Sequence, residues 1–79
     1  MHPLYHLLAR LDLGKWHYTL SRNRPDTIMV SVTFVGERVE IDVFEDGSME
    51  VSRFTGNEEI IGDEKFFLAL LEKKEAEKA

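Results

Sequence analysis

The first residues of the chain place leucines at the spacing of a helix. The apolar stripe consists of Leu4, Leu7, Leu8 and Leu11. Their spacing of i, i+3, i+4 and i+7 is typical of an amphipathic helix. Pro3 suits the first helical turn, where its missing N–H loses no hydrogen bond, and Gly14 suits the position just past the end. The pattern therefore predicts a helix over Pro3–Leu13.

Stretches with a period of two follow this helix. Residues 16–21 alternate large apolar with polar side chains, and residues 27–35 are rich in β-branched residues. Two further alternating stretches follow Gly36 and Gly47. The apolar face that they share consists of Val30, Val32, Phe34, Val39, Ile41, Val43, Met49 and Val51. We therefore expect four strands, each with one face turned to the core.

The first hairpin turn is expected at Gly36-Glu37, because a glycine at the first loop position favours a type II′ turn. Closing that loop pairs Val32 with Ile41 and Val30 with Val43. Every apolar residue of one strand then meets an apolar residue of the other, as a half-buried antiparallel pair requires.

The second hairpin turn offers two loop lengths with different consequences. A two-residue Asp46-Gly47 loop would place Val43 opposite Glu50 and so mix the two faces. A three-residue loop that starts at Glu45, with Gly47 in the left-handed conformation, pairs Val43 with Met49 instead. We predict the three-residue loop, because a slip of one residue would turn a whole apolar set to water.

A second helix is expected near Asp63, a preferred N-cap residue. Its apolar stripe consists of Phe66, Phe67, Leu70 and Leu71, and residues 72–79 form a solvated helical tail without an apolar face. The chain is then a single domain over residues 1–79 with a core over about 3–71. The predicted fold is α+β in two layers: helix, four-stranded antiparallel meander, helix, with both helices on one sheet face.

Charge narrows the expected partners. The chain has 79 residues, a formal net charge of −5 and no cysteine, which removes thiol nucleophiles and Cys-ligated zinc. Residues 39–62 hold seven acidic side chains and one basic one, Arg53. This acidic stretch argues against nucleic acid and against an anionic membrane surface as partners. No apolar run approaches the ~20 residues of a membrane helix and no secretory signal opens the chain, so we expect a cytoplasmic protein.

The strand face opposite the core gathers the candidate binding residues. With the predicted register, Asp42 lies directly opposite Glu50, and Glu40 lies nearby on the same face. Opposed like charges are unfavourable in a sheet, so this face suits a basic protein partner. Phe44 and Phe54 fall on the same face near opposite ends, and exposed aromatics at a polar rim are typical of interfaces. The alternative is a solvated face whose charges only keep the protein from aggregating.

Signals for catalysis and for cofactors are weak. His2 and His6 have a spacing that can hold one metal ion, but no carboxylate ligand is fixed nearby. His17 lacks an identifiable nucleophile partner, and the Asp42–Glu50 pair lacks the deep cleft of a glycosidase. Arg22 and Arg24 could hold an anion, or form part of a solvated loop. We therefore expect no catalytic residues, no metal and no cofactor.

Three short segments carry a resemblance to a group of small bacterial proteins, most of which have no assigned function. The segments are Ile28-Met29-Val30, Gly36-Glu37-Arg38 and Asp46-Gly47-Ser48-Met49-Glu50-Val51, and the likeness covers roughly residues 4–71. The group is similar in size, acidity and layout to bacterial toxin-immunity proteins. The resemblance implies an antidote that occludes a toxin.

The leading expectation is thus a non-catalytic protein-binding module that uses Glu40, Asp42 and Glu50 against a basic protein partner. An alternative is a structural homodimer that uses Phe44, Phe54 and an open sheet edge, or a small secretion or assembly chaperone. A small-molecule enzyme is a third possibility, and it requires a pocket that the sequence does not predict.

Overall fold

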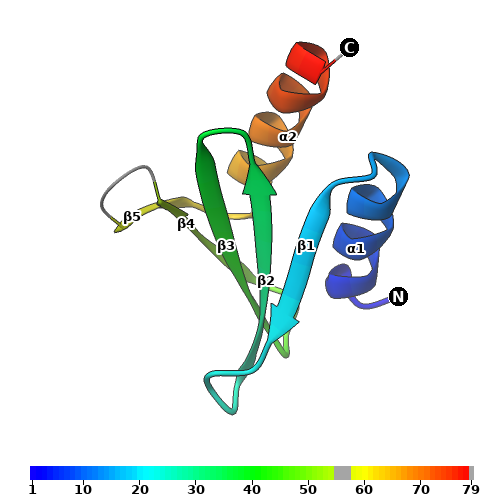
Figure 1. The fold of residues 1–79 in the computed structure, drawn as a ribbon. Coiled ribbons are helices and arrows are strands. Elements are labelled where there is room, and N and C mark those ends of the chain that lie inside the picture. Colours follow the sequence, from blue (N-terminus) through cyan, green and yellow to red (C-terminus); the bar gives the residue numbers. More distant parts are fainter. Residues whose placement is uncertain (55–57, 79) are drawn as a thin grey trace.

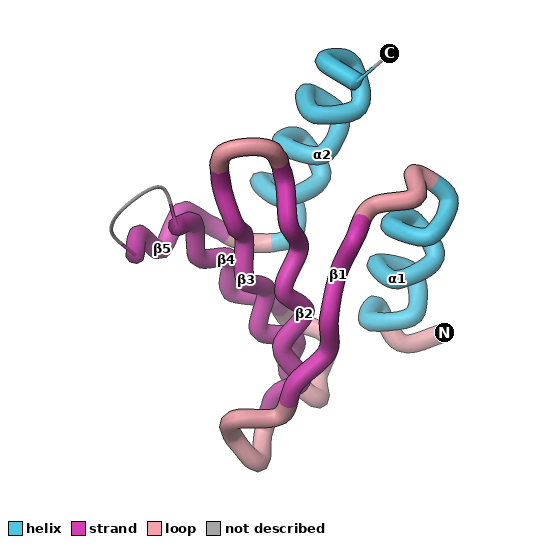
Figure 2. The backbone as a smooth tube through the Cα atoms, in the orientation of Figure 1, coloured by secondary structure: helices cyan, strands magenta, loops and turns pink. Residues whose placement is uncertain are grey.

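The protein is an α+β domain in which two helices flank an antiparallel sheet (Figures 1 and 2). The computed structural model describes residues 1–54 and 58–78. The elements are α1 (Pro3–Leu13), β1 (His17–Ser21), β2 (Thr27–Phe34), β3 (Glu37–Phe44), β4 (Met49–Phe54), β5 (Glu58–Gly62) and α2 (Glu64–Lys78). The strands are hydrogen-bonded in the order β1-β2-β3-β4-β5, each antiparallel to the next. The predicted class and the antiparallel meander of β1 to β4 are confirmed.

Helix α1 begins and ends where its leucine spacing predicts. His2 is the N-cap, and its Nδ1 accepts a hydrogen bond from the Leu4 backbone N–H at 3.1 Å. The other ring nitrogen of His2 lies 2.8 Å from the backbone oxygen of Glu45, in the β3–β4 turn. Leu7 and Leu11 are buried, so the predicted stripe carries the packing of this helix.

Among the residues whose burial is described, the core is one cluster with members on both helices and on β2, β3 and β4. Its members are Leu7, Leu11, Val30, Val32, Phe34, Val39, Ile41, Val43, Met49, Val51, Phe67, Leu70 and Leu71. All eight strand residues of the predicted apolar face belong to it. The strand parity inferred from the sequence is therefore confirmed. That both helices cover a single face of the sheet stays a prediction.

The β2–β3 turn differs from its prediction by one residue position. The two loop residues are Val35 and Gly36, whereas Glu37 already belongs to β3 and pairs with Phe34. Gly36 has φ +82° at the second loop position, as in a type II turn. The predicted type II′ turn at Gly36-Glu37 is wrong, and the register shifts by two residues. Val32 accordingly pairs with Val39, and the apolar faces still match.

The β3–β4 turn has the predicted three-residue loop. Val43 pairs with Met49, and Gly47 has φ +91°. Within the loop, Asp46 Oδ1 accepts hydrogen bonds from the Ser48 backbone N–H at 2.9 Å and from its hydroxyl at 2.6 Å. These bonds lower the pKa of Asp46 below its ordinary value. The turn is thus held by side-chain bonds as well as by the backbone.

A fifth strand, β5, extends the meander beyond the four that were predicted. It pairs with β4, placing Ser52 opposite Ile60, and the register shifts between Val51 and Ser52. Such a β-bulge interrupts the alternation of sides along a strand. The period of two that reveals the other strands is therefore missing from this segment.

Helix α2 follows the predicted start but differs in its last turns. Asp63 Oδ1 accepts a hydrogen bond from the Phe66 backbone N–H at 3.3 Å, as an N-cap does. The segment predicted to be a solvated helical tail is helical to Lys78, as expected, but it is not wholly solvated, since Lys74 and Glu75 are half-buried. Two of its side chains bond to the rest of the protein: Lys74 to Glu37, and Glu75 to Arg10 at 3.0 Å.

Two turn glycines allow the effect of backbone strain on stability to be separated from the effect of a close neighbour. A Cβ at Gly36 would meet no atom within 4 Å, whereas one at Gly47 would lie 2.8 Å from Cγ of Pro3. Since both glycines have positive φ, Gly36→Ala costs about 1 kcal/mol of backbone strain. Gly47→Ala costs about 2 kcal/mol or more, because it also displaces the start of α1. Urea unfolding of both variants measures the difference, and equal losses would show that the Pro3 contact is unimportant.

Candidate functional site

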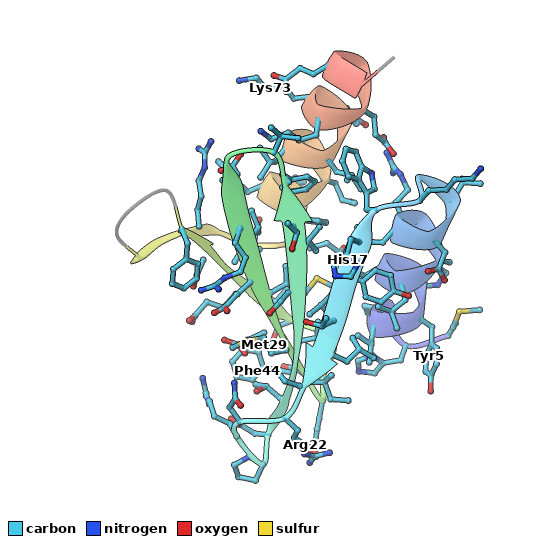
Figure 3. All side chains as sticks on the ribbon, in the orientation of Figure 1. Tyr5, His17, Arg22, Met29, Phe44 and Lys73 are labelled. Atoms are coloured by element: carbon cyan, nitrogen blue, oxygen red, sulfur yellow. The ribbon has the colours of Figure 1, made fainter. Side chains whose placement is uncertain are left out.

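The candidate site is the side of the sheet that alternates with the core positions, here called the outer face. Three rows of residues cross it from β1 to β4: Ser21–Met29–Asp42–Glu50, Thr19–Ser31–Glu40–Ser52 and His17–Thr33–Arg38–Phe54. The labels of His17, Met29 and Phe44 locate this face in Figure 3. The predicted pairs across β3 and β4 are confirmed. The β2 residue in each row stands two positions earlier than predicted, so Met29 rather than Ser31 lies beside Asp42.

Asp42 and Glu50 form the centre of the candidate site. They are directly opposed on β3 and β4, and both are half-buried. Within the described residues, neither makes an ion pair. The Oδ1 atom of Asp42 is buried and has no hydrogen-bond partner in the part of the chain that the structure describes. Both features are unfavourable in the isolated chain, because like charges repel across a strand pair and a buried acceptor loses its water.

Glu40 differs from these two acids because the chain supplies it with a cation. The guanidinium of Arg38 lies 3.5 Å from Glu40 Oε2 and 4.7 Å from the centroid of the Phe54 ring. At this distance the cation is attracted both to the carboxylate and to the face of the ring. One end of the outer face is therefore already neutralised within the chain.

Phe44 has a similar cover at the other end of β3. The guanidinium of Arg24 lies 5.4 Å from the centroid of its ring and also pairs with Asp26 at 3.2 Å. Phe44 and Phe54 are both half-buried. The structure thus brings all five predicted residues to one face, but the two aromatic rings are shielded by arginines. As far as residues 1–54 and 58–78 show, the Asp42–Glu50 pair is the part of the face that has no cation within ion-pair distance.

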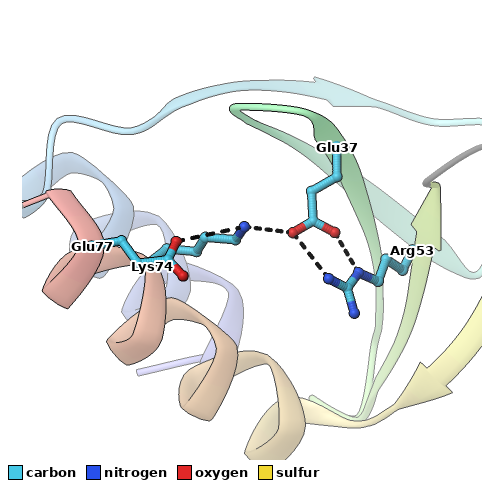
Figure 4. Close-up of polar contacts among 4 residues, drawn as sticks. All are labelled: Glu37, Arg53, Lys74 and Glu77. Atoms are coloured by element: carbon cyan, nitrogen blue, oxygen red, sulfur yellow. Dashed lines mark hydrogen bonds and ion pairs between the residues drawn. The ribbon is translucent and has the colours of Figure 1, made fainter.

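A buried carboxylate that the sequence did not reveal lies on the opposite side of the sheet, at the start of β3. The side chain of Glu37 is 4% exposed and accepts hydrogen bonds from Arg53 of β4, including one from Nη2 at 3.3 Å. Lys74 of α2 places its Nζ 2.7 Å from Glu37 Oε1 (Figure 4). The Arg53 bonds, with help from Lys74, hold the pKa of Glu37 below its usual value of 4.5 despite its burial. This cluster ties two strands to α2.

The remaining residues that the sequence singled out either bond to nearby backbone or are exposed. His2 caps α1, and Arg22 donates a hydrogen bond to the backbone oxygen of Pro25 at 2.6 Å. His17 is exposed on the outer face. Across the described part of the chain, no group of three or more side chains could hold a metal ion, and no helix is long and apolar enough to span a membrane.

Two of the pockets in the described part of the chain lie at opposite ends of the sheet. One of about 330 Å³ is lined by α1, the 22–28 segment and the end of β3, including Tyr5, Ile28 and Phe44. Another of about 340 Å³ is lined by Trp16, Phe34, Val35, Lys74 and Glu77. Neither is lined by Glu40, Asp42 or Glu50. Among the described residues, Glu40, Asp42 and Glu50 thus line the outer face and none of the pockets.

Comparison with known proteins identifies no relative of this chain. No family model, no curated protein and no solved structure matches the chain. The charges and contacts of the outer face are therefore the features that indicate a function.

The Glu37 cluster makes a pH-dependent prediction. Because the folded pKa is lowered, the carboxylate stabilises the fold above its usual pKa of 4.5, and this contribution is lost as pH falls through the lower folded value. At pH 7, Glu37→Gln is expected to lower the free energy of unfolding by about 2 kcal/mol, since it leaves Arg53 and Lys74 without their anion. The deficit should shrink between about pH 5 and pH 3. Urea unfolding across this range, with the exposed Glu72→Gln as control, measures it; a constant deficit would contradict the assignment.

The opposition of Asp42 and Glu50 leads to a prediction about stability. Glu50→Lys replaces a like-charge pair with an attractive one, so the free energy of unfolding should rise by about 0.5 kcal/mol. Glu72→Lys on the exposed side of α2 changes net charge equally and serves as the control. Thermal unfolding at low salt compares them, and equal shifts would mean that net charge alone is responsible.

Proposed function

We propose that the chain is a non-catalytic protein-binding module whose outer face receives a basic protein. The observation that carries the proposal is the Asp42–Glu50 pair, two opposed half-buried acids that make no ion pair within the described residues. A lysine or arginine at either position would remove the repulsion. The unfavourable arrangement is explained if a partner provides the cation.

The physical basis is electrostatic complementarity. A partner with lysine or arginine side chains is attracted by the acidic face during encounter, which raises the association rate more than it raises the final affinity. On docking, a guanidinium can bond to Asp42 and Glu50 together, because directly opposed side chains are only about 5 Å apart at Cβ. Binding then relieves a repulsion that the free chain carries.

The class of partner that fits best is a basic toxin, with the chain as its immunity protein. The resemblance to small toxin-immunity proteins supports this, and so does charge, since nucleases are basic where they hold their substrate. A standard interface takes about 800 Å² from each partner. That area is about a sixth of the 5154 Å² surface of the chain. A single docked protein would therefore occupy much of one side of the molecule.

A homodimer through Phe44 and Phe54 has less support. Arg24 and Arg38 lie over these rings, and interface anchors are usually aromatic side chains that enter a pocket of the partner. A second acidic face would also be repelled by the first.

The proposal predicts a charge-dependent interaction that two matched variants can test. The tagged chain is used to capture proteins from a lysate of the cells that encode it, and their amounts are measured by mass spectrometry. Asp42→Asn with Glu50→Gln should lower the capture of a basic protein about tenfold, because the cations of the partner lose their anions. Glu72→Gln with Glu77→Gln removes the same charge from α2 and should have little effect.

Salt provides the second arm of this experiment. Capture by the wild-type chain should weaken from 50 to 300 mM NaCl, and the doubly substituted outer face should be less sensitive to salt. Equal capture by all three chains, or a captured protein that is itself acidic, would overturn the proposal.

A further inference from the structure

The negative charge of the chain is distributed unevenly across its sheet. Residues 39–62, which include most of β3 and all of β4 and β5, hold seven acidic side chains and one basic one. Residues 1–27, which include β1, hold four basic side chains and two acidic ones. Strand β1 lies at the opposite end of the sheet from β5. Two copies that met at β1 would therefore keep their acidic segments farthest apart.

Strand β1 also lacks three of the features that protect terminal strands. Edge strands usually carry a charged residue, a proline or a bulge, which prevent pairing with another chain. His17–Ser21 contains no Asp, Glu, Lys, Arg or proline, and its pairing with β2 is regular. The other terminal strand, β5, carries Glu58 and Glu59 and pairs with β4 through a bulge.

Leu20 shows where cover is missing. It pairs with the fully buried Val30 and so belongs to the core side, yet it is 51% exposed. Helix α1 lies beside the upper part of β1 (Figure 1), where Tyr18 donates a hydrogen bond to Asp12 at 2.7 Å. Tyr5, in the first turn of α1, is 61% exposed and lines the pocket of about 330 Å³ described above. The Leu20 end of β1 is thus an apolar position on the core side that is only half covered.

We propose that a second copy of this chain docks along the Leu20 end of β1, with the two β1 strands antiparallel about a two-fold axis. Directly opposed residues of an antiparallel pair share one side of the sheet. Leu20 must then meet a core-side residue of the other copy, which is Leu20 or Tyr18 for registers centred on β1. Either contact removes an exposed leucine from water.

The same geometry explains why the occupant can be another acidic chain. The β3 strands of the two copies would stand five strand spacings apart, about 24 Å at ~4.8 Å per spacing. This is well beyond the Debye length of about 8 Å at physiological salt. The outer faces would hardly repel each other, and both would stay free. The dimer is therefore independent of the proposed basic partner, and either proposal can fail without the other.

Sedimentation velocity on the purified chain from 5 to 500 µM tests the dimer. The wild-type chain is expected to dimerise within this range, and Leu20→Asp to weaken dimerisation at least tenfold. Thr19→Lys places a charge in the same edge without touching the core, and it should also weaken dimerisation. Val35→Asp is the control, because Val35 is 99% exposed at the β2–β3 turn. Circular dichroism establishes that each variant is folded.

Three outcomes would overturn this inference. The first is a wild-type chain that stays monomeric up to 500 µM. The second is a dimer that neither Leu20→Asp nor Thr19→Lys weakens while both remain folded. The third is equal weakening by Val35→Asp, which would place the interface elsewhere.

Discussion

The three-residue turn that ends at Gly47 is the constraint on which the rest of the structure depends. It sets the register of β3 against β4, and this register decides which side of the sheet each residue occupies. A slip of one residue would turn Ile41 to water and Asp42 into the core. The core cluster and the acidic outer face are therefore two results of one turn. The contact of Pro3 with Gly47 extends the same constraint to α1.

Matching apolar with apolar residues across strands predicts which side of the sheet each residue occupies. It predicts less well which residue pairs with which. The bounds of α1 and the β3–β4 pairing follow from the sequence, because the two-residue alternative for the second loop would place Val43 opposite Glu50. The β2–β3 register does not follow, since a shift of two residues keeps every side chain on its side. Val32 meets an aliphatic residue whether it pairs with Val39 or with Ile41. In the structure Glu37 leaves the loop and joins β3, where Arg53 and Lys74 bond to it.

The sequence likewise predicts one part of the candidate site and not another. Strand parity alone places all five predicted residues on one face, and the structure agrees. The arginines over Phe44 and Phe54 could not be predicted, because the reach of a long side chain depends on tertiary structure. Nor could the burial of Glu37, since its cations come from distant positions in the chain. Strand β5 was missed because its bulge interrupts the alternation that identifies a strand.

The position of Trp16 gives the molecule a built-in optical reporter. It is the only tryptophan in the chain, and its ring packs edge-to-face on Phe34 with centroids 5.0 Å apart. It also lines a pocket with Lys74 and Glu77 of α2, and it stands at the connection between α1 and β1. Detachment of α2 would admit water to the indole and shift its emission to longer wavelength. Fluorescence of the unlabelled protein therefore responds to the docking of α2 as well as to the integrity of the sheet, because the indole lies next to both.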